Sequence, residues 1–286
     1  MITHKLDTIL SYYTQPGAMC QLGEYAAQVR TLPRDVPALV RVLQGLVLHI
    51  FWAERYGVKL SEERQAEVQI RRVQPKLERL LHIDPRPFTT PRPVEQRLVG
   101  NCRDFALLFS AFLKELGVPA RPRCGFGTYF MPNHFEDHWM TEYWNNTEER
   151  WVQVDPQLDD LQKQVLHIAF DPLDMPNGQF ILAGEAWRMC RAGEANPDDF
   201  GIFQWHGWDF IRGNLMRDFL ALNKVVVLPW DFWTATGSPV ASLTPPQMEA
   251  VDRIAALTLA GNDAFAEIRS LYEQDPTFHV PQEWLE

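Results

Sequence analysis

Cys102 stands in the local setting that a reactive cysteine needs. It follows Gly100 and Asn101 and begins a stretch with apolar residues at helical spacing, which predicts a helix whose first turn carries the thiol. Unpaired backbone N–H groups and the positive end of the helix dipole favour the thiolate there, and Gly100 permits a close backbone approach. The same N–H groups can stabilise an oxyanion formed when the sulfur attacks a carbonyl. By position alone, a buried structural cysteine explains the residue equally well.

A histidine and an aspartate follow in settings that suit a base and its orienting carboxylate. His138 begins an aromatic, strand-like segment, and Asp155 follows the next such segment, directly before Pro156. Adjacent strands of a hairpin can place an imidazole beside a carboxylate, which holds the ring in the tautomer that accepts the thiol proton. A single histidine is usually structural, and Asp-Pro is a common turn. In this order, however, Cys102, His138 and Asp155 predict a nucleophile–base–orienter triad.

The segments around these residues resemble the transglutaminase-like superfamily. They are GNCRDFALLF (100–109), LGVPAR (116–121), CGF (124–126), DHWMTEYW (137–144) and WVQVDP (151–156). The runs FGTYF (126–130), FIRGN (210–214) and RD (217–218) also resemble a group of uncharacterised bacterial transglutaminase-like proteins. The resemblance to the superfamily covers about residues 94–157. One departure is that a tryptophan often found two residues after the histidine is replaced here by Met140, with Trp139 before it.

The resemblance implies a papain-like core in which Cys102 is the nucleophile, His138 the general base and acid, and Asp155 the orienter. It also implies acyl transfer through a thioester on the cysteine, with water, an amine or another group as the acceptor. Hydrolysis of an amide or peptide bond is favoured, because water is always present and no residue marks an amine site. The alternative is a catalytically silent interaction module that keeps the architecture.

Other residues offer alternative sites. Gln96, in an extended connector before Cys102, is a candidate oxyanion donor, although a solvated glutamine is the simpler interpretation. His134 and His138 have the spacing of a zinc helix, but the segment after them is strand-like, so a zinc hydrolase is not predicted. Among the other cysteines, Cys124 and Cys190 are expected to be structural, and Cys20 is unassigned; no C-x-x-C pair indicates a disulfide framework or a zinc ribbon.

The first third of the chain reads as helical. Helices are predicted over 36–56, ending at Gly57, and over 64–81, kinked at Pro75. The proline-rich stretch 84–93 is expected to be an extended connector.

The strongest helix prediction covers 101–116, stopped by Gly117, with strands predicted over 120–129, 139–144 and 151–154. Beyond residue 156 the pattern is irregular until about 208. Helices are then predicted over 210–222, 248–259 and 263–272, the second opened by a capping box at 244–247, with a short buried segment at 225–228.

These elements predict an α+β fold with a papain-like or transglutaminase-like core, in which the nucleophile helix packs on an antiparallel sheet. Three regions are expected: an N-terminal helical region (1–83), the catalytic core (84–175) and a mostly helical C-terminal region (176–286) that packs on the core.

Composition limits the possible partners. Of the 286 residues 46% are hydrophobic and 22% charged, which is typical of a globular protein. A net charge of −10 disfavours binding to nucleic acid. No signal peptide and no apolar run long enough for a membrane helix is visible, so a cytoplasmic protein without membrane partners is predicted. No cofactor or metal site is expected, and no calcium loop is present. The expected partner is a protein or peptide substrate, and the oligomeric state is not predicted.

Overall fold

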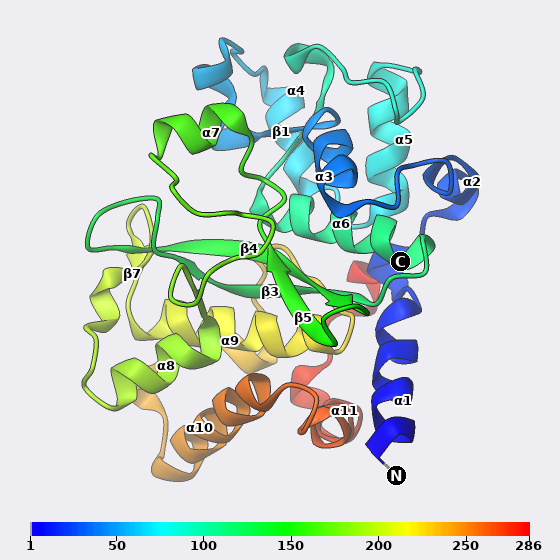
Figure 1. Ribbon diagram of the computed structural model, residues 1–286. Coiled ribbons are helices and arrows are strands. Elements are labelled where there is room, and N and C mark those ends of the chain that lie inside the picture. The colour runs from blue at the N-terminus through cyan, green and yellow to red at the C-terminus, as the bar shows by residue number, and fades with distance from the viewer. Residues whose placement is uncertain (1) are drawn as a thin grey trace. The chain divides into compact units, whose positions relative to one another are not determined.

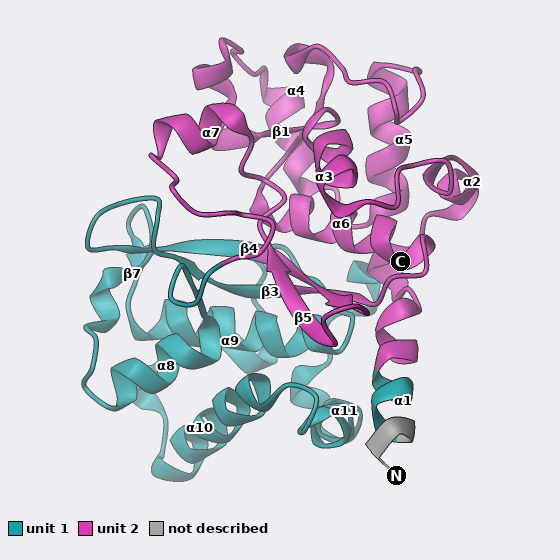
Figure 2. Cartoon of the chain, in the orientation of Figure 1, with its two compact units in different colours: residues 1–9, 123–139, 176–286 teal, residues 10–122, 140–175 magenta. Residues whose placement is uncertain are grey.

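The computed structural model describes residues 2–286, which form two compact units (Figures 1 and 2). Of the described residues, unit 1 comprises 2–9, 123–139 and 176–286, and unit 2 comprises 10–122 and 140–175. The chain crosses between the units within helix α1 (Ile2–Thr14), within the strands β3 (Ala120–Gly127) and β4 (Phe135–Asn145), and after residue 175. The consecutive regions 1–83, 84–175 and 176–286 stay a prediction.

Unit 2 carries the predicted nucleophile and most of the helices of the first third of the chain. Its elements are α2 (Ala26–Val29), α3 (Val36–Gln44), β1 (Val47–His49), α4 (Glu62–Gln65), α5 (Val73–Ile83), β2 (Leu98–Gly100), α6 (Cys102–Glu115), β5 (Arg150–Val154) and α7 (Asp160–Val165). The helix α1 (Ile2–Thr14) begins in unit 1 and ends in unit 2.

The predicted helix over 36–56 is wrong in its second half. Helix α3 starts at an Asp35 cap and ends at Gly45. The chain then forms β1, which pairs in parallel with β2, before a 3₁₀ helix over Ile50–Tyr56. Pairing with a distant strand therefore overrides the local helical spacing. Gly57, with φ of 78°, terminates this segment as expected.

The predicted helix over 64–81 is also divided. Helix α4 continues into a 3₁₀ turn over Ala66–Gln69, and α5 starts anew at Val73. Pro75 produces no kink, because it lies in the first turn of α5, where its missing N–H has no intrahelical partner to lose.

Helix α6 confirms the strongest prediction. Asn101 caps it in a capping box with Asp104, and Gly117 follows its end with φ of 83°. The helix is buried along nearly its whole length. It packs on the sheet, since the Thr141 hydroxyl in β4 donates to the Ala106 carbonyl at 3.1 Å and lies 3.4 Å from the Ser110 hydroxyl.

The strands follow the predicted order. Strand β4 pairs antiparallel with β5 from Thr141 opposite Val154 to Asn145 opposite Arg150. The sheet order is β6–β3–β4–β7–β8, with β5 also on β4. The α+β class is confirmed, but the sheet is mixed, because β7 joins β4 in parallel.

Unit 1 holds more regular structure than its sequence pattern indicated. Its further elements are β6 (Phe180–Leu182), α8 (Ala183–Arg191), β7 (Phe200–Ile202), β8 (Trp205–His206), α9 (Trp208–Leu222), α10 (Pro245–Ala260) and α11 (Phe265–Gln274). Short elements thus occupy much of the stretch 156–208 that looked irregular. The capping box at Thr244 and Gln247 is confirmed at the start of α10, and the segment 225–228 is buried without forming a strand.

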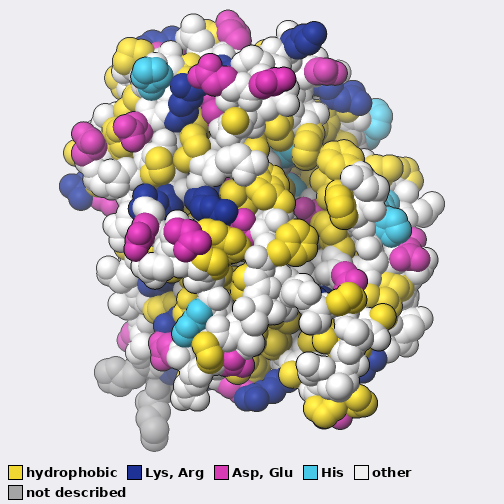
Figure 3. All heavy atoms as spheres, turned by 180° about the vertical axis from the view of Figure 1, so that it is seen from behind, with side chains coloured by type: hydrophobic (Ala, Val, Ile, Leu, Met, Phe, Trp, Pro, Cys, Tyr) yellow, Lys and Arg dark blue, Asp and Glu magenta, His cyan; other side chains and the backbone are white. Residues whose placement is uncertain are grey.

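Two surface features bear on possible partners. Within residues 2–286, no helix combines the length and the apolar character needed to cross a membrane. On the face shown in Figure 3, basic side chains are interspersed with acidic ones, so that face offers no continuous basic surface.

Candidate active site

Cys102 is the first residue of α6, as predicted. The Asn101 side chain accepts the Asp104 backbone N–H at 3.2 Å, and the Asp104 carboxylate accepts the Asn101 N–H at 3.2 Å. These bonds fix the entry of the chain into the helix. The thiol therefore lies at the positive end of the helix dipole, in the first turn, where backbone N–H groups lack intrahelical partners. Cys102 is 8% exposed.

Buried charges anchor the start of α6. Asp104 forms ion pairs with Lys76 of α5 at 3.0 Å and with Arg103 at 2.9 Å, and all three side chains are fully buried. Arg103 also donates to the Arg71 carbonyl at 2.6 Å. Burial lowers the pKa of Lys76, while the neighbouring Asp104 acts to raise it. These contacts join the first turn of α6 to α5 and to the segment before it.

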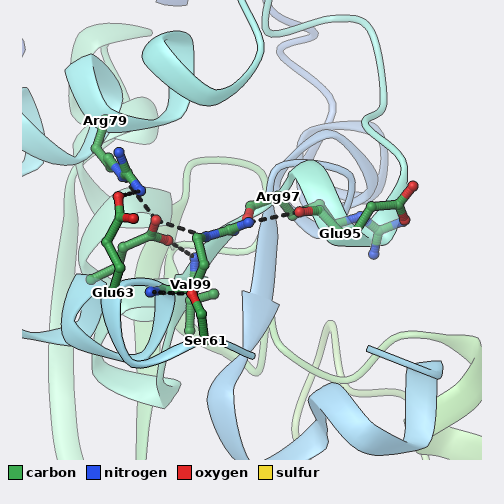
Figure 4. A network of polar contacts seen from close by, with 8 residues as sticks. Ser61, Glu63, Arg79, Glu95, Arg97 and Val99 are labelled. Atoms are coloured by element: carbon green, nitrogen blue, oxygen red, sulfur yellow. Dashed lines mark hydrogen bonds and ion pairs between the residues drawn. The ribbon is translucent and has the colours of Figure 1, made fainter. Parts of the chain in front are cut away.

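A second network holds the strand that leads to the nucleophile (Figure 4). The buried Glu67 carboxylate accepts the Val99 backbone N–H of β2 at 2.8 Å. Arg64 and Arg79 each donate to its other oxygen at 2.8 Å. Arg64 also binds the carbonyl of Glu95 at 2.7 Å and that of the residue two positions later. This network fixes β2, which ends two residues before the thiol.

Asp155 lies directly after β5 and is fully buried. Its carboxylate accepts the Gln157 N–H at 3.0 Å, and its own N–H donates to the Pro172 carbonyl at 2.8 Å. The Gln44 side chain binds the carbonyl of Pro156 at 3.2 Å. Backbone bonds on both sides therefore hold the aspartate in one orientation.

His138 lies in β4, within the part of the strand that belongs to unit 1, and is 1% exposed. Aromatic rings surround it: its centroid lies 4.9 Å from that of Phe130, 6.0 Å from that of Tyr129 and 6.3 Å from that of Phe180. Such packing restricts the rotation of the imidazole.

Helix α9 anchors the strand beside the histidine. The buried Asp137 accepts a hydrogen bond from the Asn214 amide at 2.7 Å, and Arg217 donates to the Asn214 oxygen at 3.1 Å. Burial raises the pKa of Asp137, although the bond from Asn214 opposes this rise. On the same helix, Asp218 pairs with Arg123 of β3 at 2.8 Å. In the sequence, residues 210–218 carried a helix prediction and a family resemblance; in the structure they also support β3 and β4.

The predicted site residues are thus distributed over both units. Cys102 and Asp155 belong to unit 2 and His138 to unit 1, and the geometry of the complete triad stays a prediction. Gln96 ends a 3₁₀ turn over Val94–Gln96 and is exposed, so its role as an oxyanion donor also stays a prediction.

The other cysteines and His134 lie in surroundings that do not favour a catalytic role. Cys124 is fully buried in β3, and burial raises the pKa of Cys190 in α8 to about 11. Cys20 is buried as well. His134 precedes β4, near Glu136 at 3.5 Å, so it does not share a helix with His138. Across the described chain, no cluster of three or more His, Cys, Asp or Glu side chains is arranged to hold a metal ion.

One polar recess near β1 escaped the sequence analysis. It is lined by Gln44, Val47, Leu48, His49, Tyr56, Phe105, Gln157, Asp159 and Gln162. The Tyr56 hydroxyl donates to Asp159 at 2.6 Å, and Gln157 donates to the Gln162 side chain at 3.0 Å. The sequence did not identify His49 as a site residue, because its segment was predicted to be part of the helix over 36–56. The one local sign of a special role was that His49 is a polar residue between the apolar pairs 47–48 and 50–51.

Comparison with known proteins agrees with the resemblance seen in the sequence. Residues 58–156 match the model of the Transglutaminase-like superfamily, and this segment includes Cys102, His138 and Asp155. No curated protein matches the chain. Among solved structures, "a Putative Cysteine Protease from Cytophaga hutchinsonii" is 17% identical, with a TM-score of 0.34. That match covers 52% of this chain and 42% of the other, so this chain spans less than half of that structure's length.

Proposed function

We propose that this chain, whose residues 58–156 match the transglutaminase-like superfamily, is an enzyme that transfers acyl groups through a thioester on Cys102. The observation that carries the proposal is the place of the thiol, at the first residue of a capped helix whose start is held by buried charges. A helix end of this kind favours the thiolate, which is the reactive form of cysteine.

In the proposed reaction the Cys102 sulfur attacks an amide carbonyl, the carbonyl electron pair moves onto oxygen, and His138 takes the thiol proton. Collapse of this intermediate expels the amine, which receives the proton from His138 and leaves a thioester. Water then attacks the thioester and regenerates the thiol with release of an acid. Asp155 orients the imidazole throughout.

The register of the β4–β5 hairpin supports the roles of His138 and Asp155. Thr141 is opposite Val154, so the aspartate directly follows the registered end of β5. The histidine precedes Thr141 in the partner strand by three positions. A protein or peptide amide is the proposed substrate, and water is the proposed acceptor.

Alkylation of the thiol tests the proposal without knowledge of the substrate. The wild-type protein is treated with iodoacetamide between pH 5 and 9, and modified cysteines are located by mass spectrometry. We expect a fast phase well below the ordinary thiol pKa of ~8.5, which Cys102→Ala removes and the matched Cys190→Ser retains.

A second probe tests the chemistry. p-Nitrophenyl acetate should release a burst of p-nitrophenol and leave an acetyl group on Cys102, and His138→Asn should slow this acylation by about 10²–10⁴-fold. A thiol that reacts only near pH 8.5, together with the absence of a burst, would support the catalytically silent interaction module instead.

A further inference from the structure

His49 lies at the same edge of a parallel strand pair as the nucleophile. Strand β1 pairs in parallel with β2, and its last residue, His49, is the register partner of Gly100. The carboxyl ends of parallel strands face the same side, which is where α/β proteins commonly place functional groups. Cys102 follows Gly100 by two residues, so the imidazole and the thiol leave neighbouring strand ends of unit 2.

The imidazole also lies over the face of α6 that carries Cys102. The His49 ring stacks on Phe105 with a centroid distance of 6.4 Å and an interplanar angle of 24°. Phe105 is three positions after Cys102, and residues at this spacing share one face of a helix. The strand register and the ring stacking are independent observations, and both place His49 against the segment 100–105 that carries Cys102.

The hydrogen bonding of His49 assigns its tautomer. Nδ1 accepts the backbone N–H of Phe51 at 3.3 Å, which caps the following 3₁₀ helix. A neutral imidazole whose Nδ1 is an acceptor carries its proton on Nε2. His49, which is 6% exposed, thus presents an N–H donor rather than a base.

We propose that His49 Nε2–H donates a hydrogen bond to the oxyanion formed when the Cys102 sulfur adds to a carbonyl. In that step the S–C bond forms and the carbonyl electron pair moves onto oxygen, while His49 keeps its proton and stabilises the negative charge. The backbone N–H groups at the start of α6 supply the complementary donors. In this proposal His49 takes the role for which Gln96 was a candidate in the sequence. This inference rests on the proposed function, because it requires a tetrahedral intermediate.

Two substitutions test the Nε2–H donor and the Nδ1 acceptor of His49 separately. His49→Asn places an oxygen where Nδ1 accepts the Phe51 N–H but deletes the Nε2–H group. His49→Gln can return an amide N–H near the position of Nε2 but loses the cap. His82→Asn, at an exposed histidine of α5, is the matched control.

The readouts are the burst of p-nitrophenol from p-nitrophenyl acetate, the rate of Cys102 alkylation by iodoacetamide, and the thermal midpoint. We expect His49→Asn to slow acylation by about 10²–10³-fold, the usual effect of losing one oxyanion donor, with alkylation unchanged, because alkylation forms no oxyanion. The thermal midpoint checks that the variant stays folded. His49→Gln should acylate within about tenfold of wild type, and His82→Asn should match wild type in every readout.

Full acylation by His49→Asn would overturn this inference alone. An equal loss of acylation and alkylation in that variant would also overturn it, because His49 would then act on the thiolate. No burst from the wild-type protein would refute the proposed function and this inference together.

Discussion

The ion cluster at the start of α6 makes a quantitative prediction about stability. Asp104 forms ion pairs with both Lys76 and Arg103, at 3.0 and 2.9 Å, and all three side chains are fully buried. Asp104→Asn removes the carboxylate that pairs with both buried cations, and breaking a buried pair in this way costs about 3–5 kcal/mol of unfolding free energy. The new asparagine can still accept the Asn101 N–H, so the cap contributes little to this loss.

Lys76→Met should cost less, about 1 kcal/mol, because Asp104 keeps Arg103 as a counterion and a methionine fills most of the space of the lysine stem. In the double variant only Arg103 remains charged. Its loss of stability should therefore be smaller than the sum of the two single losses by about 1–3 kcal/mol.

Urea unfolding followed by circular dichroism measures the three free energies, with His82→Asn as a control for the general effect of substitution in α5. Two results would refute the reasoning: an Asp104→Asn loss below about 1 kcal/mol, or a double variant whose loss equals the sum of the singles. Either result would mean that water or another group satisfies the two cations.

Two further predictions follow from pKa shifts. Burial raises the pKa of Asp137 above its ordinary value of 3.8. Between 3.8 and this raised pKa, the folded protein holds a proton that the unfolded chain releases. The free energy of unfolding therefore falls as the pH rises through this range. Asp137→Asn should therefore stabilise the protein more, relative to wild type, at pH 7 than at pH 4; equal differences in urea unfolding at both pH values would contradict this. Because burial raises the pKa of Cys190 to about 11, about 1% of this thiol is ionised at pH 9, and in Cys102→Ala it should react with iodoacetamide about 100-fold more slowly than a fully ionised thiol. Rapid labelling of Cys190 in a peptide map would show that its surroundings do not suppress the thiolate.

Elements defined by local signals could be predicted from the sequence. Helix α6 has a cap, an apolar stripe and a terminating glycine within one short stretch, and the sequence placed both ends of it within a residue or two. The segment around Val47 has helical spacing too, but its backbone pairs with β2, whose partner residues lie about fifty positions later. No local pattern carries information about that pairing.

The same distinction applies to the candidate site. The type and setting of Cys102 were visible in the sequence, because a helix start is a local feature. Glu67 and Lys76 lie within the predicted helix over 64–81, where no local signal marks them, yet both are buried and support the nucleophile segment from more than twenty positions away. Asn214 reaches Asp137 from still further along the chain. Charge partners separated in this way become visible only when the fold is known.

The single carboxylate of Glu67 joins two arginines to the strand that precedes the nucleophile, and Lys76 reaches the helix itself. All of these groups come from residues 64–79, upstream of the proline-rich connector. A polypeptide trimmed to begin at residue 84 would keep Cys102, His138 and Asp155 but lose the hydrogen bonds and ion pairs that support the segment carrying the thiol. Anyone who shortens this protein to a minimal reactive fragment should retain the chain from about residue 58, where the family match begins.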